Sequence, residues 1–120
     1  MSLSIINRNR MICLFDCYGA LLTQKQKTLF NYYFNEDLSL AEISDLMGIS
    51  RQAVHNSISR CEDILENYEA SLGIFARANS MENILDQTIQ LIEKSLDSQQ
   101  WSEKEYLTLL AQLKTVRKAD

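Results

Sequence analysis

Five polar side chains suited to recognising DNA bases lie within nine residues of this 120-residue chain. Arginine can pair with guanine through two hydrogen bonds, and glutamine or asparagine can pair with adenine in the same way. The candidate reading residues are Arg51, Gln52, His55, Asn56 and Ser59. No acidic residue occurs between Asp45 and Glu62, so the segment carries no charge that repels phosphate. The segment therefore predicts a surface that binds double-stranded DNA.

Three serine or arginine residues around this segment complete the predicted DNA-binding set. Arg60 and Ser39 are placed to bind phosphate oxygens, which fix the orientation of a protein on the duplex without reading its sequence. Ser50 directly precedes the segment and is expected to cap the helix that carries it.

The residues before and within this segment predict two helices joined by a tight turn. Ser39 with Glu42 fits a capping box, and Gly48 can adopt the positive φ that ends a helix. We expect the first helix to turn four apolar residues inward: Leu40, Ile43, Leu46 and Met47. The range 39–65 is therefore predicted to form a helix-turn-helix, whose second helix would lie in the major groove.

The rest of the chain also predicts helices. It has no proline and only three glycines, a poor supply of turn residues for a β-sandwich or barrel. Apolar residues at helical spacing predict further helices, over about 5–18, from a capping box at Thr23 to about Asn35, from near Asn79, and after Ser102. Arg8 and Arg10 are expected to face solvent or a partner.

The long helix that starts at Arg51 carries a heptad-like apolar seam at steps of four and three residues. Its members are Val54, Ile58, Cys61, Leu65, Tyr68 and Leu72, and Gly73 follows them. This seam either packs only on the protein's own helices or extends across a dimer. The next helices are apolar over wide arcs, so we expect a homodimer through the C-terminal helices.

Taken together, these patterns predict an all-α protein. Residues 1–72 are expected to form the helix-turn-helix domain. Residues 73–120 are expected to form a C-terminal helical extension, an assembly region packed on the first domain as one unit. Residues 1–60 carry six basic and five acidic groups, whereas residues 61–120 carry six and eleven. The first half can therefore approach phosphate more easily than the second.

Several classes of protein are not indicated. Cys13, Cys17 and Cys61 are expected to be ordinary thiols, because an odd number without a signal peptide does not suit a disulfide framework. His55 is the only histidine, and there is no phosphate-binding glycine loop, so we expect no metal, no cofactor and no enzyme activity. Without a long apolar run or a secretory segment, we expect a cytoplasmic protein with no membrane span.

Residues 22–65 resemble region 4 of a bacterial sigma factor, most strongly over 39–44 and 48–54. More closely, the sequences at 9–11, 20–23, 32–33, 37–43 and 50–54 resemble the YlxM family of Gram-positive bacteria. This resemblance covers about residues 5–75. It implies a sigma-region-4-like fold, a DNA-binding regulator, and a link to the signal recognition particle pathway through gene neighbourhood.

One departure from region 4 leaves a second function open. Recognition helices of that region usually carry more basic residues, whereas Cys61, Glu62 and Asp63 stand here where positive charge is expected. The alternative is a non-enzymatic adaptor that binds the signal recognition particle GTPase and keeps the helix-turn-helix as a scaffold.

Overall fold

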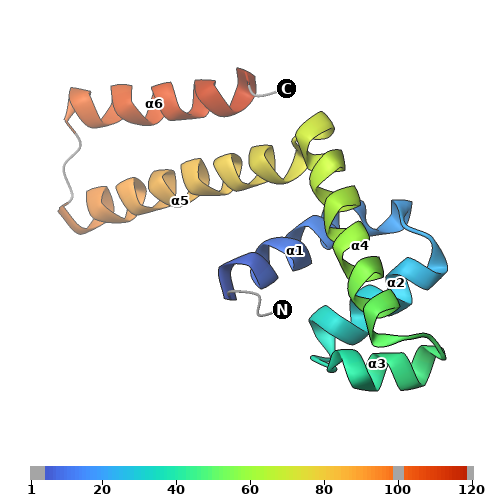
Figure 1. The fold of residues 1–120 in the computed structure, drawn as a ribbon. Helices are drawn as coiled ribbons and strands as arrows, with labels where there is room; N and C mark the ends of the chain where they lie inside the picture. The colour runs from blue at the N-terminus through green and yellow to red at the C-terminus, as the bar shows by residue number, and fades with distance from the viewer. Residues whose placement is uncertain (1–4, 99–101, 119–120) are drawn as a thin grey trace. The chain divides into compact units, whose positions relative to one another are not determined.

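The computed structural model describes residues 5–98 and 102–118, and all regular structure in these ranges is helical (Figure 1). The helices are α1 (Ile5–Tyr18), η1 (Gly19–Leu21), α2 (Gln24–Phe30), η2 (Asn31–Asn35), α3 (Leu40–Met47), α4 (Arg51–Leu72), α5 (Ile74–Ser98) and α6 (Glu103–Lys118). The predicted all-α class is therefore confirmed. None of the described helices is both long and apolar enough to cross a membrane.

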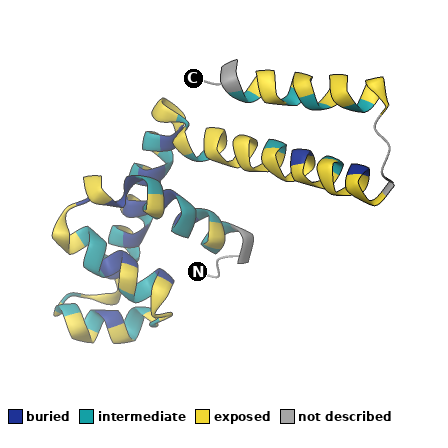
Figure 2. Ribbon diagram, turned by 180° about the vertical axis from the view of Figure 1, so that it is seen from behind, coloured by how far each residue is buried: buried dark blue, intermediate teal, exposed yellow. Residues whose placement is uncertain are grey.

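The chain divides into two compact units, Met1–Phe75 and Ala76–Asp120. In the first unit, α4 is the central element, and α1, α2 and α3 all pack against it (Figure 1). The residues coloured as buried lie where these helices meet (Figure 2). The core consists of Met11, Leu14, Tyr18, Leu22, Leu29, Phe30, Phe34, Ile43, Val54, Ile58, Cys61 and Leu65.

Local capping residues start most helices of the first unit. Thr23 accepts a hydrogen bond from the Gln26 amide at 3.2 Å, and the Gln26 side chain accepts one from the Thr23 amide at 2.9 Å. Ser39 and Glu42 form the same reciprocal pair, with both bonds 3.1 Å long. These capping boxes confirm the predicted helix starts. The helix after Thr23 also ends near Asn35 as expected, although its last turn, η2, is a π-helix.

Arg8 and Arg10 are tied to the protein rather than left for solvent or a partner, so that prediction was wrong. Arg8 donates to the carbonyls of Tyr33 and Phe34 at 3.0 and 2.8 Å, and it lies 3.1 Å from Asp37. Arg10 forms a two-bond pair with Glu66, at 2.7 and 2.8 Å. Both arginines hold α1 to the rest of the first unit. The hydrogen bond and charge of Arg10 lower the pKa of Glu66.

The prediction that a helix starts near Asn79 was also wrong, because α5 starts at Ile74. Its first amides are satisfied by side chains from other helices. The Ile74 amide donates to the Tyr18 hydroxyl at 3.1 Å, and the Phe75 amide donates to the Glu69 carboxylate at 3.0 Å. The Tyr18 hydroxyl in turn donates to Glu69 at 2.6 Å. This buried group therefore supplies the cap that the local sequence lacks.

The apolar seam of α4 packs mainly inside the first unit. Val54, Ile58, Cys61 and Leu65 are fully buried among α1, α2 and α3. Of the two alternatives for this seam, packing on the protein's own helices holds for these four residues. Leu72, at the end of the helix, is exposed.

The second unit is a hairpin of two antiparallel helices formed by α5 and α6 (Figure 1). Polar groups line the contact between these helices. Thr88 donates to Gln112 at 3.1 Å, and Ser95 donates to Glu105 at 3.3 Å. Most of α5 and α6 is exposed (Figure 2), and the buried residues that the structure describes on α5 are Thr88 and Ser95. Apolar side chains therefore remain on the outside of the hairpin.

Burial makes the thiol of Cys61 a poor nucleophile. It is buried in the core, and desolvation raises its pKa to about 11. Because only the thiolate attacks alkylating reagents, we expect Cys61 to resist iodoacetamide at pH 8 in the folded protein and to react fully in urea. Cys13 and Cys17 are only half-buried and serve as internal references. Peptide mass spectrometry measures all three, and alkylation of native Cys61 as fast as of Cys13 would contradict the buried position.

Candidate nucleic-acid interface

A tight turn at residues 48–50 joins α3 to α4 and fixes the direction of the second helix. Gly48 adopts φ 69° and ψ 32°, and its amide donates to the Ser44 carbonyl at 2.9 Å. The Ser44 hydroxyl donates to the carbonyl of Ile49. Ser50 then begins α4, and its side chain accepts a hydrogen bond from the Ala53 amide at 3.0 Å. The turn therefore has the predicted helix-turn-helix form, locked by side-chain bonds as well as by glycine.

Apolar contacts hold the two helices of this motif together. Ile43 of α3 and Val54 of α4 have no exposed surface, and Ile58 is only 1% exposed. Leu46 was predicted to face inward, but it is 60% exposed. The eight residues of α3 make only about two helical turns. Ile43 and the half-buried Leu40 and Met47 already form its contact with α4, and Leu46 therefore stays exposed.

The outward face of α4 carries four of the predicted DNA-binding side chains. Arg51, Gln52, Asn56 and Arg60 are all exposed over the first three turns. The Gln52 amide donates to the Asn56 side chain at 3.0 Å, so these two residues lie side by side. A pair of linked amides between two arginines offers both donors and acceptors to base edges.

His55 and Ser59 lie at the half-buried margin of this surface rather than at its centre. The Nδ1 atom of His55 is buried without a hydrogen-bond partner in the part of the chain that the structure describes. Glu62 lies two turns further along the same face of α4. The pKa of Glu62 is raised by burial and by the charge of neighbouring Asp63, and the opposing effects of His55 and Asn7 are smaller. His55 therefore presents only part of its ring to a ligand.

Ser39 lies at the start of α3, as the prediction required, and it is exposed. Its hydroxyl accepts the bond from Glu42 and retains a proton to donate. A phosphate beside Ser39 would also meet the amide end of α3.

The charge of this surface is more even than the sequence suggested. Arg51 and Arg60 are exposed on α4, but exposed Asp45 on α3 and Asp63 on α4 accompany them. Since Arg8 and Arg10 pair with Asp37 and Glu66, they add little to the field at the reading face. Counting charges along the chain could not reveal this, because the pairs join residues far apart in sequence.

The left-handed conformation of Gly48 makes this residue sensitive to substitution. A side chain would meet no atom within 4 Å, so the expected cost is conformational alone. We expect Gly48→Ala to lower the free energy of unfolding by about 1–2 kcal/mol. Urea denaturation followed by circular dichroism measures this change. Gly48→Asn should cost less, because asparagine tolerates positive φ better, and equal effects of the two substitutions would contradict this reason.

Comparisons with known proteins place this geometry in a family. The UPF0122 family, described as "Putative helix-turn-helix protein, YlxM / p13 like", matches residues 5–108. A UPF0122 protein of Listeria innocua is 38% identical over 90% of this chain and 94% of its own length. Relatives from Exiguobacterium sibiricum and Streptococcus pneumoniae are 47% and 42% identical, over 69% and 77% of this chain and 78% and 84% of their own lengths. The predicted resemblance to YlxM is confirmed, and the chain belongs to the UPF0122 family of YlxM-like helix-turn-helix proteins.

Proposed function

We propose that this protein is a DNA-binding regulator that reads duplex DNA with α4. The observation that carries this proposal is the exposed set Arg51, Gln52 and Asn56 on the first two turns of α4, directly after the capped turn. In this arrangement the start of a recognition helix meets base edges in the major groove. Residues 1–72 form the reading domain and residues 73–120 the assembly region, in a non-enzymatic cytoplasmic protein.

The side chains have different roles in this proposal. Arg51 pairs with guanine, and Gln52 or Asn56 pairs with adenine. Arg60 and Ser39 bind phosphate, while Ser50 orients α4 by capping its first turn. His55 and Ser59 contact the duplex at the edge of the surface, since both are half-buried.

A homodimer through the C-terminal helices is part of the same proposal. One copy exposes few basic groups on α4, so its electrostatic attraction to DNA is weak. Two linked copies would bind two half-sites. Once the first copy is bound, the second copy is held close to its half-site, which raises its effective concentration there.

Selection from a mixed pool of short duplexes, at low and moderate salt, tests this function. We expect one sequence motif to be enriched. The logarithm of affinity should fall with that of salt concentration with a slope of roughly −1 per copy, because Arg60 is the cation assigned to phosphate. Binding without enrichment would remove the sequence-reading role.

A second candidate is a protein adaptor with the helix-turn-helix as scaffold. The observation that favours it is the net charge of −5 over residues 61–120, together with the two exposed acids beside the reading face. The YlxM resemblance points to the signal recognition particle GTPase as its partner. Absence of any duplex binding at low salt, with retention of that GTPase on the immobilised full chain, would favour this candidate.

A further inference from the structure

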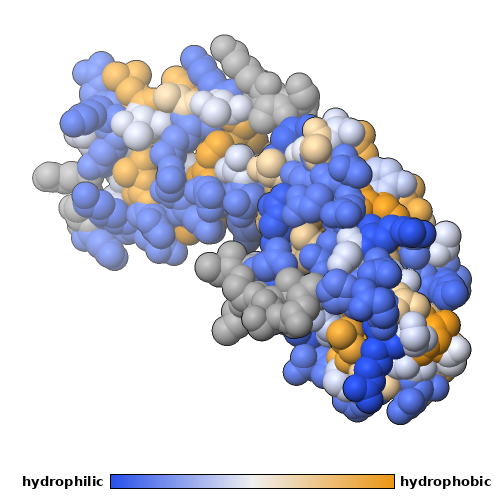
Figure 3. Space-filling view, viewed as in Figure 1, coloured by the Kyte–Doolittle hydropathy of each residue, from blue (hydrophilic) through white to orange (hydrophobic). Residues whose placement is uncertain are grey.

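The hairpin of α5 and α6 leaves large apolar side chains exposed at regular spacing. On α5 they recur at steps of four, four, three and four residues: Met81, Leu85, Ile89, Ile92 and Leu96. On α6 the stripe consists of Tyr106, Leu110 and Leu113, apart from exposed Leu107, which lies on another side of the helix. Each of these eight residues is between 38% and 69% exposed. We call them the apolar face; hydrophobic groups are visible over the hairpin in Figure 3.

The two stripes lie on the same side of the hairpin. Thr88 and Ser95 of α5 meet Gln112 and Glu105 of α6, so these residues mark the sides that the helices turn toward each other. Each residue advances a helix by about 100°. On each helix, the apolar stripe lies next to the side that faces the other helix. On both helices it is displaced from that side in the direction in which residue numbers increase around the helix axis. Because the helices are antiparallel, these displacements bring the stripes to one common side.

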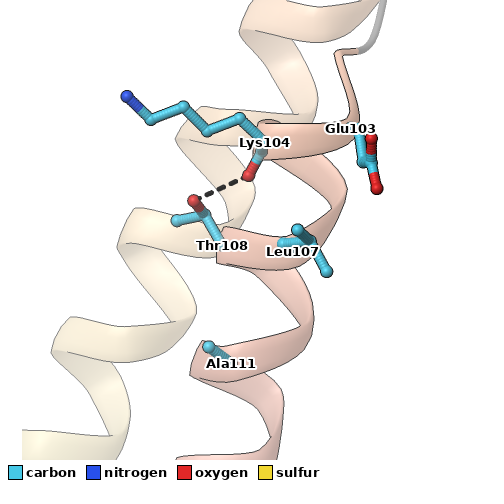
Figure 4. Close-up of a pocket in the computed structure, with 5 residues that line it drawn as sticks. All are labelled: Glu103, Lys104, Leu107, Thr108 and Ala111. Carbon is cyan, nitrogen blue, oxygen red and sulfur yellow. Dashed lines mark hydrogen bonds between the residues drawn. The ribbon is translucent and has the colours of Figure 1, made fainter.

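Among the residues that the structure describes, the opposite side of the hairpin is mostly polar. It carries Gln87, Lys94 and Thr108, all exposed. A shallow hollow on α6 is lined by Glu103, Lys104, Leu107, Thr108 and Ala111 (Figure 4). Its lining comes from a single helix, and Thr108 already donates to the Lys104 carbonyl at 2.8 Å. A partner that buries apolar surface is therefore expected to bind the apolar face rather than this polar side.

The size of the apolar face matches what one partner contributes to a stable interface. With side chains of this size and exposure, it offers roughly 800 Å² per copy, about the share of each protein in a standard-size complex. Among the described residues of the first unit, the large exposed hydrophobics are Leu21, Leu46, Leu72 and Ile74. These four residues offer too little apolar surface to cover the eight residues of the apolar face. The apolar face of a second hairpin offers a matching area.

We propose that the apolar face binds the apolar face of a second copy, forming a four-helix bundle in which α5 of each copy packs on α6 of the other. This inference specifies the dimer that the proposed function requires. Two antiparallel amphipathic helices per copy are half of such a bundle, and steps of four and three residues suit its packing. The polar contacts at Thr88 and Ser95 stay within each hairpin.

Charges beside the apolar face select this pairing over α5 on α5. The outer edge of the face on α5 carries exposed Glu82, Asp86 and Glu93. The outer edge on α6 carries exposed Lys114 and, at the start of the helix, exposed Glu103; the Thr88–Gln112 bond sets Lys114 level with Asp86. A twofold axis along the helices brings Lys114 of each copy to Asp86 of the other. Pairing α5 with α5 would instead oppose the two acidic edges.

Sedimentation of the full chain over a range of concentrations tests whether the apolar face joins two copies. We expect a dimer at micromolar concentration, and a dimer dissociation constant at least about 30-fold higher for Ile89→Gln with Leu110→Gln. Leu107→Gln is the matched control, since Leu107 is 58% exposed but lies off the face. A monomeric wild-type chain, or equal weakening by the control, would overturn the proposal.

A charge exchange tests the pairing of α5 with α6. Lys114→Glu should weaken the dimer about fivefold, and Asp86→Lys in the same chain should restore it; Lys94→Glu on the polar side should change nothing. Failure of the double variant to restore the dimer would overturn this pairing.

These experiments measure the mass of the protein in solution, without DNA. A monomer that still selects a duplex would refute the bundle alone, whereas a dimer that binds no duplex would refute the reading function alone.

Discussion

Replacing Glu69 with alanine is expected to lower the free energy of unfolding by about 2–5 kcal/mol, because a buried donor and a partly buried donor lose their acceptor. Glu69 is only 9% exposed and accepts bonds from the Tyr18 hydroxyl at 2.6 Å and the Phe75 amide at 3.0 Å. Burial and the neighbouring carboxylate raise the pKa of Tyr18, so its hydroxyl remains a donor. The same substitution removes part of the cap of α5.

Glu66→Ala provides the matched control, one turn earlier on the same helix. Glu66 pairs with Arg10, but both side chains are 41% exposed, and such surface pairs contribute at most about 1 kcal/mol. Urea unfolding followed by circular dichroism compares the two variants. If the urea midpoint of Glu69→Ala were no lower than that of Glu66→Ala, the buried Glu69 carboxylate would not stabilise the start of α5.

Replacing Arg51 with alanine is expected to weaken binding to the selected duplex about 10- to 100-fold, the effect of losing a two-bond contact to guanine. Binding to unrelated duplexes should weaken much less. Arg51 is exposed at the start of α4, so its loss should leave the free energy of unfolding unchanged. Asn56→Ala should act similarly and also release Gln52, which donates to it.

Arg60→Ala is the control for this second prediction. Arg60 is exposed on the same helix, two turns beyond Gln52, and is assigned to phosphate. Its loss should weaken all duplexes alike and reduce the salt slope by about one. Fluorescence anisotropy with selected and scrambled duplexes separates the two patterns. If Arg51→Ala also weakened both duplexes equally, Arg51 would be a phosphate contact and not a reader.

Features with local causes could be predicted from the sequence. The capping boxes at Thr23 and Ser39, the positive φ of Gly48 and the cap at Ser50 each depend on residues within four positions. Such signals do not depend on how distant parts of the chain meet. The helix-turn-helix and its boundaries therefore followed from the residues alone.

Features with distant causes could not be predicted. The start of α5 depends on Tyr18, 56 residues before Ile74. Arg8 reaches the carbonyl of Phe34, 26 residues away, so its role at the end of η2 was invisible. Periodicity also marked Leu46 as inward, although α4 covers only part of the apolar arc of α3. In each case the outcome depends on tertiary packing, which a local sequence pattern does not contain.

The hairpin shows the same limit for the assembly region. The sequence predicted wide apolar arcs there, but it could not say which part of each arc would meet the other helix. In the structure the buried positions of α5 include Thr88 and Ser95, while Ile89 and Leu96 remain exposed. Thr88 and Ser95 share that side of α5 with half-buried Ile84 and Leu91, and their hydrogen bonds to Gln112 and Glu105 cross the hairpin.

Titration of the ¹⁵N-labelled full chain with the enriched duplex, followed through its amide resonances, shows directly whether α4 reads duplex DNA. We expect the largest shifts at residues 50–60 and near Ser39, while the resonances of Lys94 and Thr108 on the polar side of the hairpin stay unmoved. Shifts concentrated on the hairpin, with residues 50–60 unchanged, would contradict this role of α4.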